Sequence, residues 1–206
     1  MGDAVGVTPT DAELMAASLH DPQQFALIFD RHARAVHRYV AFRANLGDVD
    51  DVVSEAFLTA FRTRARYDRA YDSALPWLLG IATHVLNHHR RSEGRRLTRL
   101  RAAAQAPETE FDLAETVAAG VDDAAETERV ARALARLDDR YRDILLLAAG
   151  ADLTYDEIAR ALGIPIGTVR SRLARGRRRL RELLDPGGQH KSDRPYVTPS
   201  TEGTPG

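Results

Sequence analysis

The densest cluster of side chains capable of chemistry lies near the C-terminus, where residues 170–181 hold seven arginines and no acid. Two further charge blocks precede it: residues 90–101 carry six arginines and one acid, and residues 108–128 carry eight acids and no base. Arginine presents a planar fork of N–H donors that fits phosphate oxygens and the acceptor edge of guanine. Because the formal net charge is only −1, the basic blocks reflect segregation along the chain, and they predict local contact with nucleic acid.

The residues before the arginine cluster have the pattern of a helix-turn-helix. Thr154 and Glu157 have the spacing of a capping box at a helix start, and Gly163 stands where that helix must end in left-handed backbone. A second helix is predicted from Ile166 to about Leu184. Its expected buried stripe consists of Ile166, Val169, Leu173, Leu180 and Leu184.

The face of this second helix opposite Leu173 carries hydroxyls and arginines, as steps of 100° per residue show. Small hydroxyls permit close approach to DNA, and arginines bind guanine or phosphate, so the helix suits the major groove. The residues expected to contact DNA are Thr168, Arg170, Ser171, Arg172, Arg175, Arg178 and Arg179.

The fold class predicted for the whole chain is all-α, with two small helical domains joined by a flexible linker. Apolar residues recur at three- and four-residue spacing in three stretches of the N-terminal half: 25–40, 49–61 and 77–86. One of these stripes includes Phe29. The expected organisation is a tail (1–10), a helical domain (11–106), an acidic linker (107–128), a helix-turn-helix domain (129–186) and a second tail (187–206). Glycine, proline and threonine in the first tail and the near absence of apolar residues in the second predict disorder in both.

Several protein classes are excluded by composition. The chain has no cysteine, so disulfides and thiolate metal sites are impossible. No apolar run approaches the ~20 residues that span a bilayer, and residues 1–11 lack the pattern of a signal peptide. His84 and His88 have a spacing that can bind zinc, but Val85 stands where a zincin motif needs glutamate, and no third ligand is evident. We therefore expect a cytoplasmic protein without membrane insertion, enzymatic activity, metal or cofactor.

Five stretches resemble the extracytoplasmic-function (ECF) sigma factors of the bacterial sigma-70 family. Three lie in the C-terminal half: ALARLDDRYRDILLL at 133–147, LTYDEIA at 153–159 and GIPIGTVRSRL at 163–173. Two lie upstream: DVDDVVSEAFLTAFR at 48–62 and PWLLGIATHVLNHHRR at 76–91. They occur in the order expected for the family, and the 163–173 stretch is highly specific to it. The sequence departs from the family at Ser54, where glutamine is frequent, and at His84, where asparagine is frequent.

The resemblance implies a sigma factor that binds core RNA polymerase and directs promoter-specific transcription initiation through −10 and −35 elements. The implied partners are the clamp of the largest catalytic subunit, the flap of the second-largest subunit and promoter DNA, with an anti-sigma factor as a further candidate. The implied polymerase-binding residues are Asp50, Asp51, Ser54, Glu55 and Leu58. The implied −10 residues are Arg66, Tyr67, Tyr71, His84, Asn87, Arg90 and Arg91.

Three alternatives stay open at the level of sequence. A stand-alone helix-turn-helix regulator would share the DNA-binding motif, although no ligand-binding or phosphoacceptor domain is recognisable. The tyrosines Tyr67 and Tyr71 either stack on an extruded base or pack on the helical bundle. The acidic linker either enters the basic channel of the polymerase or serves as a solvated tether.

Overall fold

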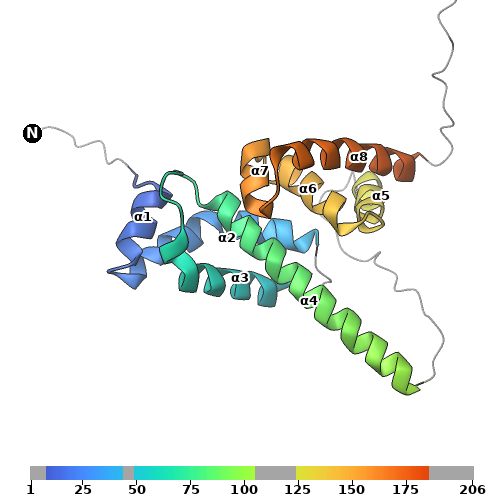
Figure 1. Cartoon of the computed structure of the whole chain (residues 1–206), viewed down its shortest axis with the longest axis horizontal. Helices are drawn as coiled ribbons and strands as arrows, with labels where there is room; N and C mark the ends of the chain where they lie inside the picture. The colour runs from blue at the N-terminus through green and yellow to red at the C-terminus, as the bar shows by residue number, and fades with distance from the viewer. Residues whose placement is uncertain (1–7, 44–48, 105–123, 186–206) are drawn as a thin grey trace, which may run out of the picture.

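The computed structural model describes residues 8–43, 49–104 and 124–185, and in these ranges the chain is all-α (Figure 1). The N-terminal unit contains α1 (Asp11–Ser18), α2 (Phe25–Ala41), α3 (Val49–Thr63) and α4 (Leu75–Ala104). Two 3-10 turns, η1 (Pro22–Gln24) and η2 (Arg64–Arg66), connect them. The C-terminal unit contains α5 (Ala124–Ala135), α6 (Asp139–Gly150), α7 (Tyr155–Leu162) and α8 (Ile166–Leu184). The predicted fold class is thus confirmed, and α5 begins inside the stretch that was expected to be linker.

The apolar stripes of α2, α3 and α4 form the core of the N-terminal unit. Ile28, Val40, Val52 and Leu79 are among its fully buried members. One predicted member does not belong to it: Phe29 is 44% exposed, with its ring edge-on to Phe57 at a centroid distance of 4.7 Å. Phe29 lies at the margin of the stripe, where Phe57 of α3 covers only part of its ring.

The helix-turn-helix in the C-terminal unit follows the predicted local chemistry. The Thr154 hydroxyl accepts a hydrogen bond from the Glu157 amide, the Glu157 carboxylate accepts one from the Thr154 amide, and Gly163 has φ +62°. In α8, Val169 and Leu173 are buried, and Leu180 and Leu183 are partly buried against the core. Leu183 thus packs against the core where Leu184 was predicted to do so. At 3.6 residues per turn, alternating steps of three and four residues are needed to stay on one face of the helix.

A buried arginine joins α5 to α6. The Arg142 guanidinium donates to the carbonyl oxygens of Leu134 (2.6 Å) and Leu137 (2.8 Å) and also to that of Ala135. Leu134 and Ala135 are the last residues of α5, and Leu137 follows in the connection to α6, so no further turn of helix can satisfy these carbonyls. Burial, together with the nearby charges of Arg90 and Arg43, lowers the pKa of Arg142 to about 10, so it stays charged at neutral pH.

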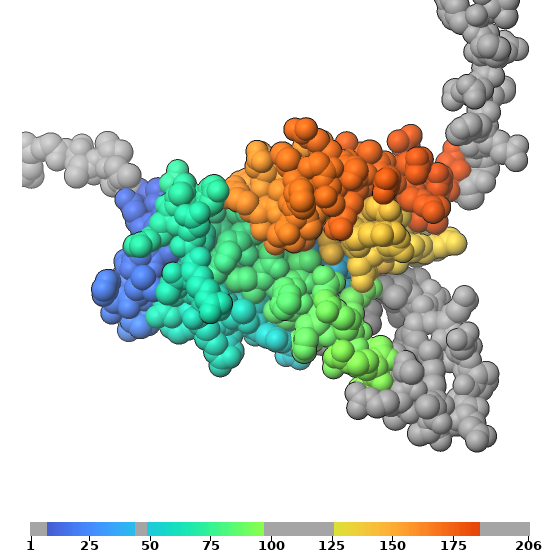
Figure 2. Space-filling view, viewed as in Figure 1, coloured from blue at the N-terminus to red at the C-terminus, as the bar shows by residue number. Residues whose placement is uncertain are grey.

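The two units pack directly against each other through α4 and α7 (Figure 1). Gly80 of α4 permits the approach: a Cβ there would stand 3.1 Å from the Ala161 carbonyl carbon and nearer still to its oxygen. Figure 2 shows the C-terminal unit lying against the surface of α4. Residues 1–7 of the first expected tail, the whole of the second tail and most of the expected linker lie outside the described residues, whereas Thr10 of the first tail caps α1.

Candidate nucleic-acid and polymerase interfaces

The outer surface of α8 carries the arginine cluster. Arg170, Arg175 and Arg177 are exposed, whereas Val169, Leu173 and Gly176 face the core. The Ser171 hydroxyl donates to the Thr168 carbonyl at 3.1 Å. Arg178 and Arg179 lie 3.8 Å and 3.6 Å from the same carboxylate, Glu182, and both stay largely exposed. The helix therefore presents a positive face suited to a polyanion.

One predicted −35 residue differs from the others. Arg172 is only half exposed, and it lines a cavity of about 640 Å³ between the two units. The same cavity is lined by His84, Asn87 and Arg91 of α4 and by Arg140 and Arg160 of the C-terminal unit. Candidate −10 and −35 residues thus lie together in this structure, in a cavity lined by four arginines and by the carboxylates of Asp139 and Asp143.

The exposed face of α3 carries all five predicted polymerase-binding residues. Asp50, Asp51, Ser54 and Glu55 are exposed, and Leu58 is 46% exposed. His37 lies 3.4 Å from Asp50, and His89 lies 2.6 Å from Glu55. In Figure 1 this helix lies along the lower edge of the molecule and α8 along the upper edge, so the C-terminal unit leaves the α3 face open.

The segment between η2 and α4 holds the two tyrosines that were assigned to the −10 element. Tyr67 is only 6% exposed, with its ring edge-on to Trp77 at 5.4 Å and its hydroxyl donating to the Tyr71 carbonyl at 2.5 Å. In this structure it packs on the bundle and cannot stack on a base. Burial and the nearby carboxylates of Asp11 and Asp72 raise the pKa of Tyr67 to about 12.

The other residues assigned to the −10 element are more accessible, and some have partners. Tyr71 is 38% exposed, and the Arg160 guanidinium lies 3.5 Å above its ring centroid. Arg66, His84 and Arg91 are exposed. Asn87 is half-buried, and its side-chain oxygen accepts from the Arg43 guanidinium at 3.2 Å.

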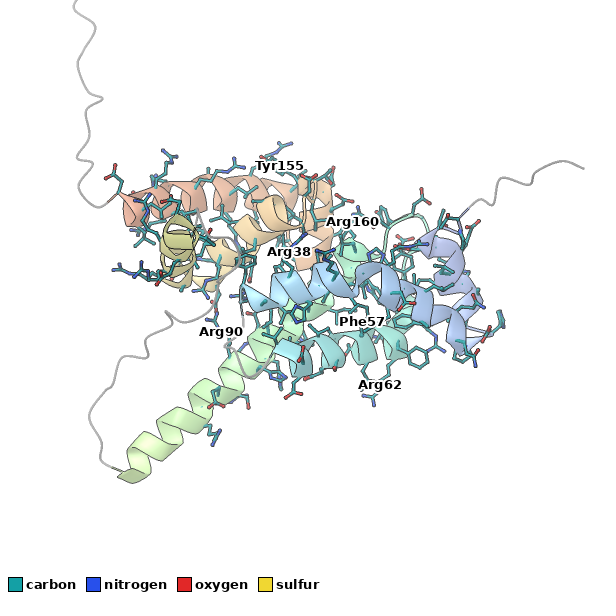
Figure 3. All side chains as sticks on the ribbon, turned by 180° about the vertical axis from the view of Figure 1, so that it is seen from behind. Arg38, Phe57, Arg62, Arg90, Tyr155 and Arg160 are labelled. Carbon is teal, nitrogen blue, oxygen red and sulfur yellow. The ribbon has the colours of Figure 1, made fainter. Side chains whose placement is uncertain are left out.

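A charge network joins the two units, and sequence reasoning missed its central members. Arg43, at the end of α2, has a fully buried side chain that lies 2.5 Å from Asp143 and 3.1 Å from Asp139. Arg90, expected to hold the DNA backbone, is paired with Asp139 here. Arg38 donates to the Gly150 carbonyl at 2.9 Å. Arg38, Arg90 and Arg160 are labelled in Figure 3 at the junction of the units.

The carboxylates of this network respond differently to their surroundings. Burial raises the pKa of Asp143 to about 6, because the attraction of Arg43 only partly offsets desolvation. Burial would also raise the pKa of Asp139, but the positive charges of Arg90, Arg43 and Arg142 outweigh this effect and hold the pKa of Asp139 below its usual value. Arg43 is 96 and 100 residues from its two acidic partners, so no local pattern in the sequence indicates these contacts.

Neither a metal site nor a membrane span is found among the described residues. In that part of the chain no three His, Asp or Glu side chains are grouped to hold a metal ion. His84 and His88 are both exposed on α4. None of the helices described is long and apolar enough to cross a membrane.

Comparison with known proteins agrees with the division into two units. The family described as Sigma-70 region 2 matches residues 28–96, and the family described as Sigma-70, region 4 matches residues 127–180. The chain is 37% identical over 151 residues to the ECF RNA polymerase sigma factor SigC of Mycobacterium tuberculosis, covering 73% of this chain and 78% of SigC. It is 34% identical over 179 residues to SigM of the same species, covering 85% of both chains.

A solved structure also resembles the chain as a whole. CnrH in complex with the cytosolic domain of CnrY matches with a TM-score of 0.61 and 27% identity, covering 86% of this chain and 98% of CnrH. The sigma factor RpoE of Bartonella quintana, solved with the anti-sigma factor NepR, has a similar fold, with a TM-score of 0.58 and 21% identity. From its two family regions and these relatives, the chain belongs to the sigma-70 family as an ECF RNA polymerase sigma factor and serves promoter-directed transcription initiation.

Proposed function

We propose that this sigma factor uses three defined surfaces, one for the polymerase clamp and one for each of the two promoter elements. The exposed face of α3 binds the clamp of the largest subunit of core RNA polymerase, and the C-terminal unit also meets the flap of the second-largest subunit. The outer face of α8 enters the major groove of the −35 element. The observation that carries this proposal is the outer surface of α8, the second helix of the helix-turn-helix, which presents exposed arginines.

The third surface serves the −10 element. It comprises Arg66 and Tyr71 beside η2, together with His84, Asn87, Arg90 and Arg91 on α4. Exposed Tyr71 is suited to stack on an unpaired base, whereas buried Tyr67 shapes the segment that carries it. The arginines of α4 then hold phosphates of the non-template strand.

Promoter geometry requires the two units to separate for this function. The −10 and −35 elements are about 25 base pairs apart, or about 85 Å along the duplex at 3.4 Å per base pair. Asn87 and Arg172 line one cavity in the present structure, so they cannot reach both elements together. The described arrangement is therefore that of the factor before it binds a promoter.

Further aspects of function follow from the family. Sigma factors act on polymerase without catalysis of their own, consistent with a chain that is not an enzyme, and we place it in the cytoplasm. The solved relatives CnrH and RpoE are bound to CnrY and NepR, which supports an anti-sigma factor as a partner here. The acidic linker stretch, mostly outside the described residues, is proposed to enter the basic channel of the polymerase.

Run-off transcription tests the proposal directly. Purified core polymerase, with and without this chain, would be supplied with genomic fragments, and start sites would be mapped. The expected result is a small set of starts that share −10 and −35 sequences and depend on the chain. If the chain bound DNA but gave no new starts with core polymerase, a stand-alone helix-turn-helix regulator would be the better description.

A further inference from the structure

A buried carboxylate in α1 contacts the segment that carries Tyr71 and is not among the residues assigned to polymerase or DNA binding. Asp11 is 2% exposed. Its Oδ1 lies 2.5 Å from Arg31 Nη1, and its Oδ2 lies 2.6 Å from His32 Nε2. The same Oδ2 accepts a hydrogen bond of 2.7 Å from the backbone amide of Ala74. One side chain thus joins α1, α2 and the segment that leads into α4.

The position of Asp11 is itself fixed on both sides. Thr10 and Glu13 form a capping box at the start of α1, with Thr10 N to Glu13 Oε2 at 2.7 Å. Arg31 also donates to the Pro9 carbonyl at 3.0 Å. Because a carboxylate with several charge-assisted hydrogen bonds has little freedom, Asp11 is a rigid anchor.

The anchor holds the C-terminal arm of the −10 segment, which we define as residues 67–74. Besides the bond to Ala74, the Asp11 amide donates to the Asp72 carbonyl at 3.1 Å. The other arm is held by Tyr67, whose ring packs on Trp77 and whose hydroxyl donates to the Tyr71 carbonyl. Residues 68–73 between these points are exposed. The conformation of the exposed part therefore depends on the anchors at its two ends.

We propose that Asp11 is a positioning residue for the −10 segment. Its carboxylate fixes the backbone at Ala74, and its amide holds Asp72, so that Tyr71 is presented in the geometry that binds single-stranded promoter DNA. The proposal rests on the proposed function, which assigns this segment to the −10 element. The buried carboxylate of Asp11 thus controls how the −10 segment binds the melted strand, although Asp11 itself does not touch DNA.

The test uses holoenzyme reconstituted with Asp11→Ala and a fluorescent single-stranded oligonucleotide carrying the −10 sequence of a mapped promoter. Affinity for this oligonucleotide is expected to fall about 5- to 150-fold, which corresponds to about 1–3 kcal/mol, the contribution of stacking one base on an aromatic side chain. Binding to core polymerase and to a −35 duplex should be unchanged. Asp30→Asn, which alters an exposed acid on α2, is the matched control and should have no effect.

A spectroscopic readout separates positioning from general loss of structure. Trp77 is the only tryptophan of the chain and contacts Tyr67, so its emission in the free protein reports on the −10 segment. In Asp11→Ala we expect altered emission and stronger quenching by acrylamide, with cooperative thermal unfolding retained. If that variant does not fold, Tyr67→Phe takes its place, because it removes only the hydroxyl bond to Tyr71 at the other arm. It should lower oligonucleotide affinity without affecting −35 binding.

Two outcomes would overturn the proposal. Unchanged Trp77 emission and unchanged oligonucleotide affinity would show that Asp11 does not position the segment. Altered emission with unchanged affinity would show that the position of the segment does not matter to the −10 strand. Failure of the proposed function is detected separately with Tyr71→Ala and Arg66→Ala: if neither reduces oligonucleotide affinity, the segment is not the −10 surface.

Discussion

Gly80→Ala offers a selective way to separate the two units. An added Cβ would lie 3.1 Å from the Ala161 carbonyl carbon and 3.2 Å from its Cα, with the carbonyl oxygen closer than real Cβ atoms approach. These are backbone atoms of α7, so no side-chain rotation relieves the overlap. Overpacking of this kind costs about 1–3 kcal/mol. Within α4 alone, alanine favours the helix over glycine by about 1 kcal/mol. The change therefore weakens the contact between units while stabilising the helix that carries it.

The assay is Förster transfer between dyes on Asp30→Cys in α2 and Glu182→Cys in α8. The natural chain has no cysteine, so labelling is confined to these sites, both of which are exposed. A penalty of 1–3 kcal/mol shifts the ratio of separated to packed units by about 5- to 150-fold. Transfer should fall in Gly80→Ala. It should not change in Gly94→Ala, on the same helix, where a Cβ meets no atom within 4 Å.

The same variant bears on DNA binding. Separation of the units uncovers Asn87 and Arg172, which are partly buried where they line the cavity, so free Gly80→Ala protein should bind promoter DNA more tightly than the natural chain. The reasoning would be refuted if transfer efficiency and DNA affinity in Gly80→Ala matched those of the Gly94→Ala control.

Three further predictions address the other surfaces. Arg175→Ala should relax preference at one −35 base pair at a cost of about 1–3 kcal/mol, whereas Arg179→Ala should weaken all duplexes alike and lower the salt slope by about one unit; selection from a randomised duplex pool distinguishes them, and identical profiles would remove α8 from the role of reader. Changing Asp51 and Glu55 together to arginine should abolish retention by core polymerase in a pull-down while circular dichroism stays helical; undiminished retention would count against the α3 assignment. Burial alone would raise the pKa of Asp11, but its hydrogen bonds to His32 and Ala74 outweigh burial and hold that pKa below its usual value. The ionised carboxylate therefore stabilises the folded state fully above the unfolded pKa of about 3.9, and this stabilisation is lost as pH falls through the folded pKa. Thermal melts should therefore show the natural chain losing its advantage over Asp11→Asn only below about pH 4, and an advantage independent of pH would contradict this.

Features that depend on neighbouring residues were predictable from the sequence. The Thr154–Glu157 capping box and the left-handed Gly163 were predicted because each is a local hydrogen-bond or backbone requirement. The exposure of Asp51 and Glu55 on α3 was predictable for a similar reason, since apolar periodicity leaves only one face for them.

Features that depend on distant contacts were not predictable. Periodicity says which side of a helix is apolar but not how far a neighbour covers it, which is why Phe29 is exposed and Leu183 packs where Leu184 was expected. Nothing in the sequence around Arg43 indicates that it is buried, because its partner Asp143 comes from α6, 100 residues further along the chain. Tyr67 was assigned to DNA contact on its position among arginines, whereas its burial depends on Trp77 at the start of α4.

The central claim is that one chain places its two units on two promoter elements, and site-directed cleavage of DNA measures this most directly. Ala70→Cys in the −10 segment and Ala174→Cys on α8 are exposed positions, and each variant carries a single cysteine to which a chelated iron can be tethered. In the complex of holoenzyme with a mapped promoter, the first should cut at the −10 element and the second at the −35 element, about 25 base pairs upstream. Cleavage by both at one element, or cleavage at sites unrelated to the promoter, would contradict the account.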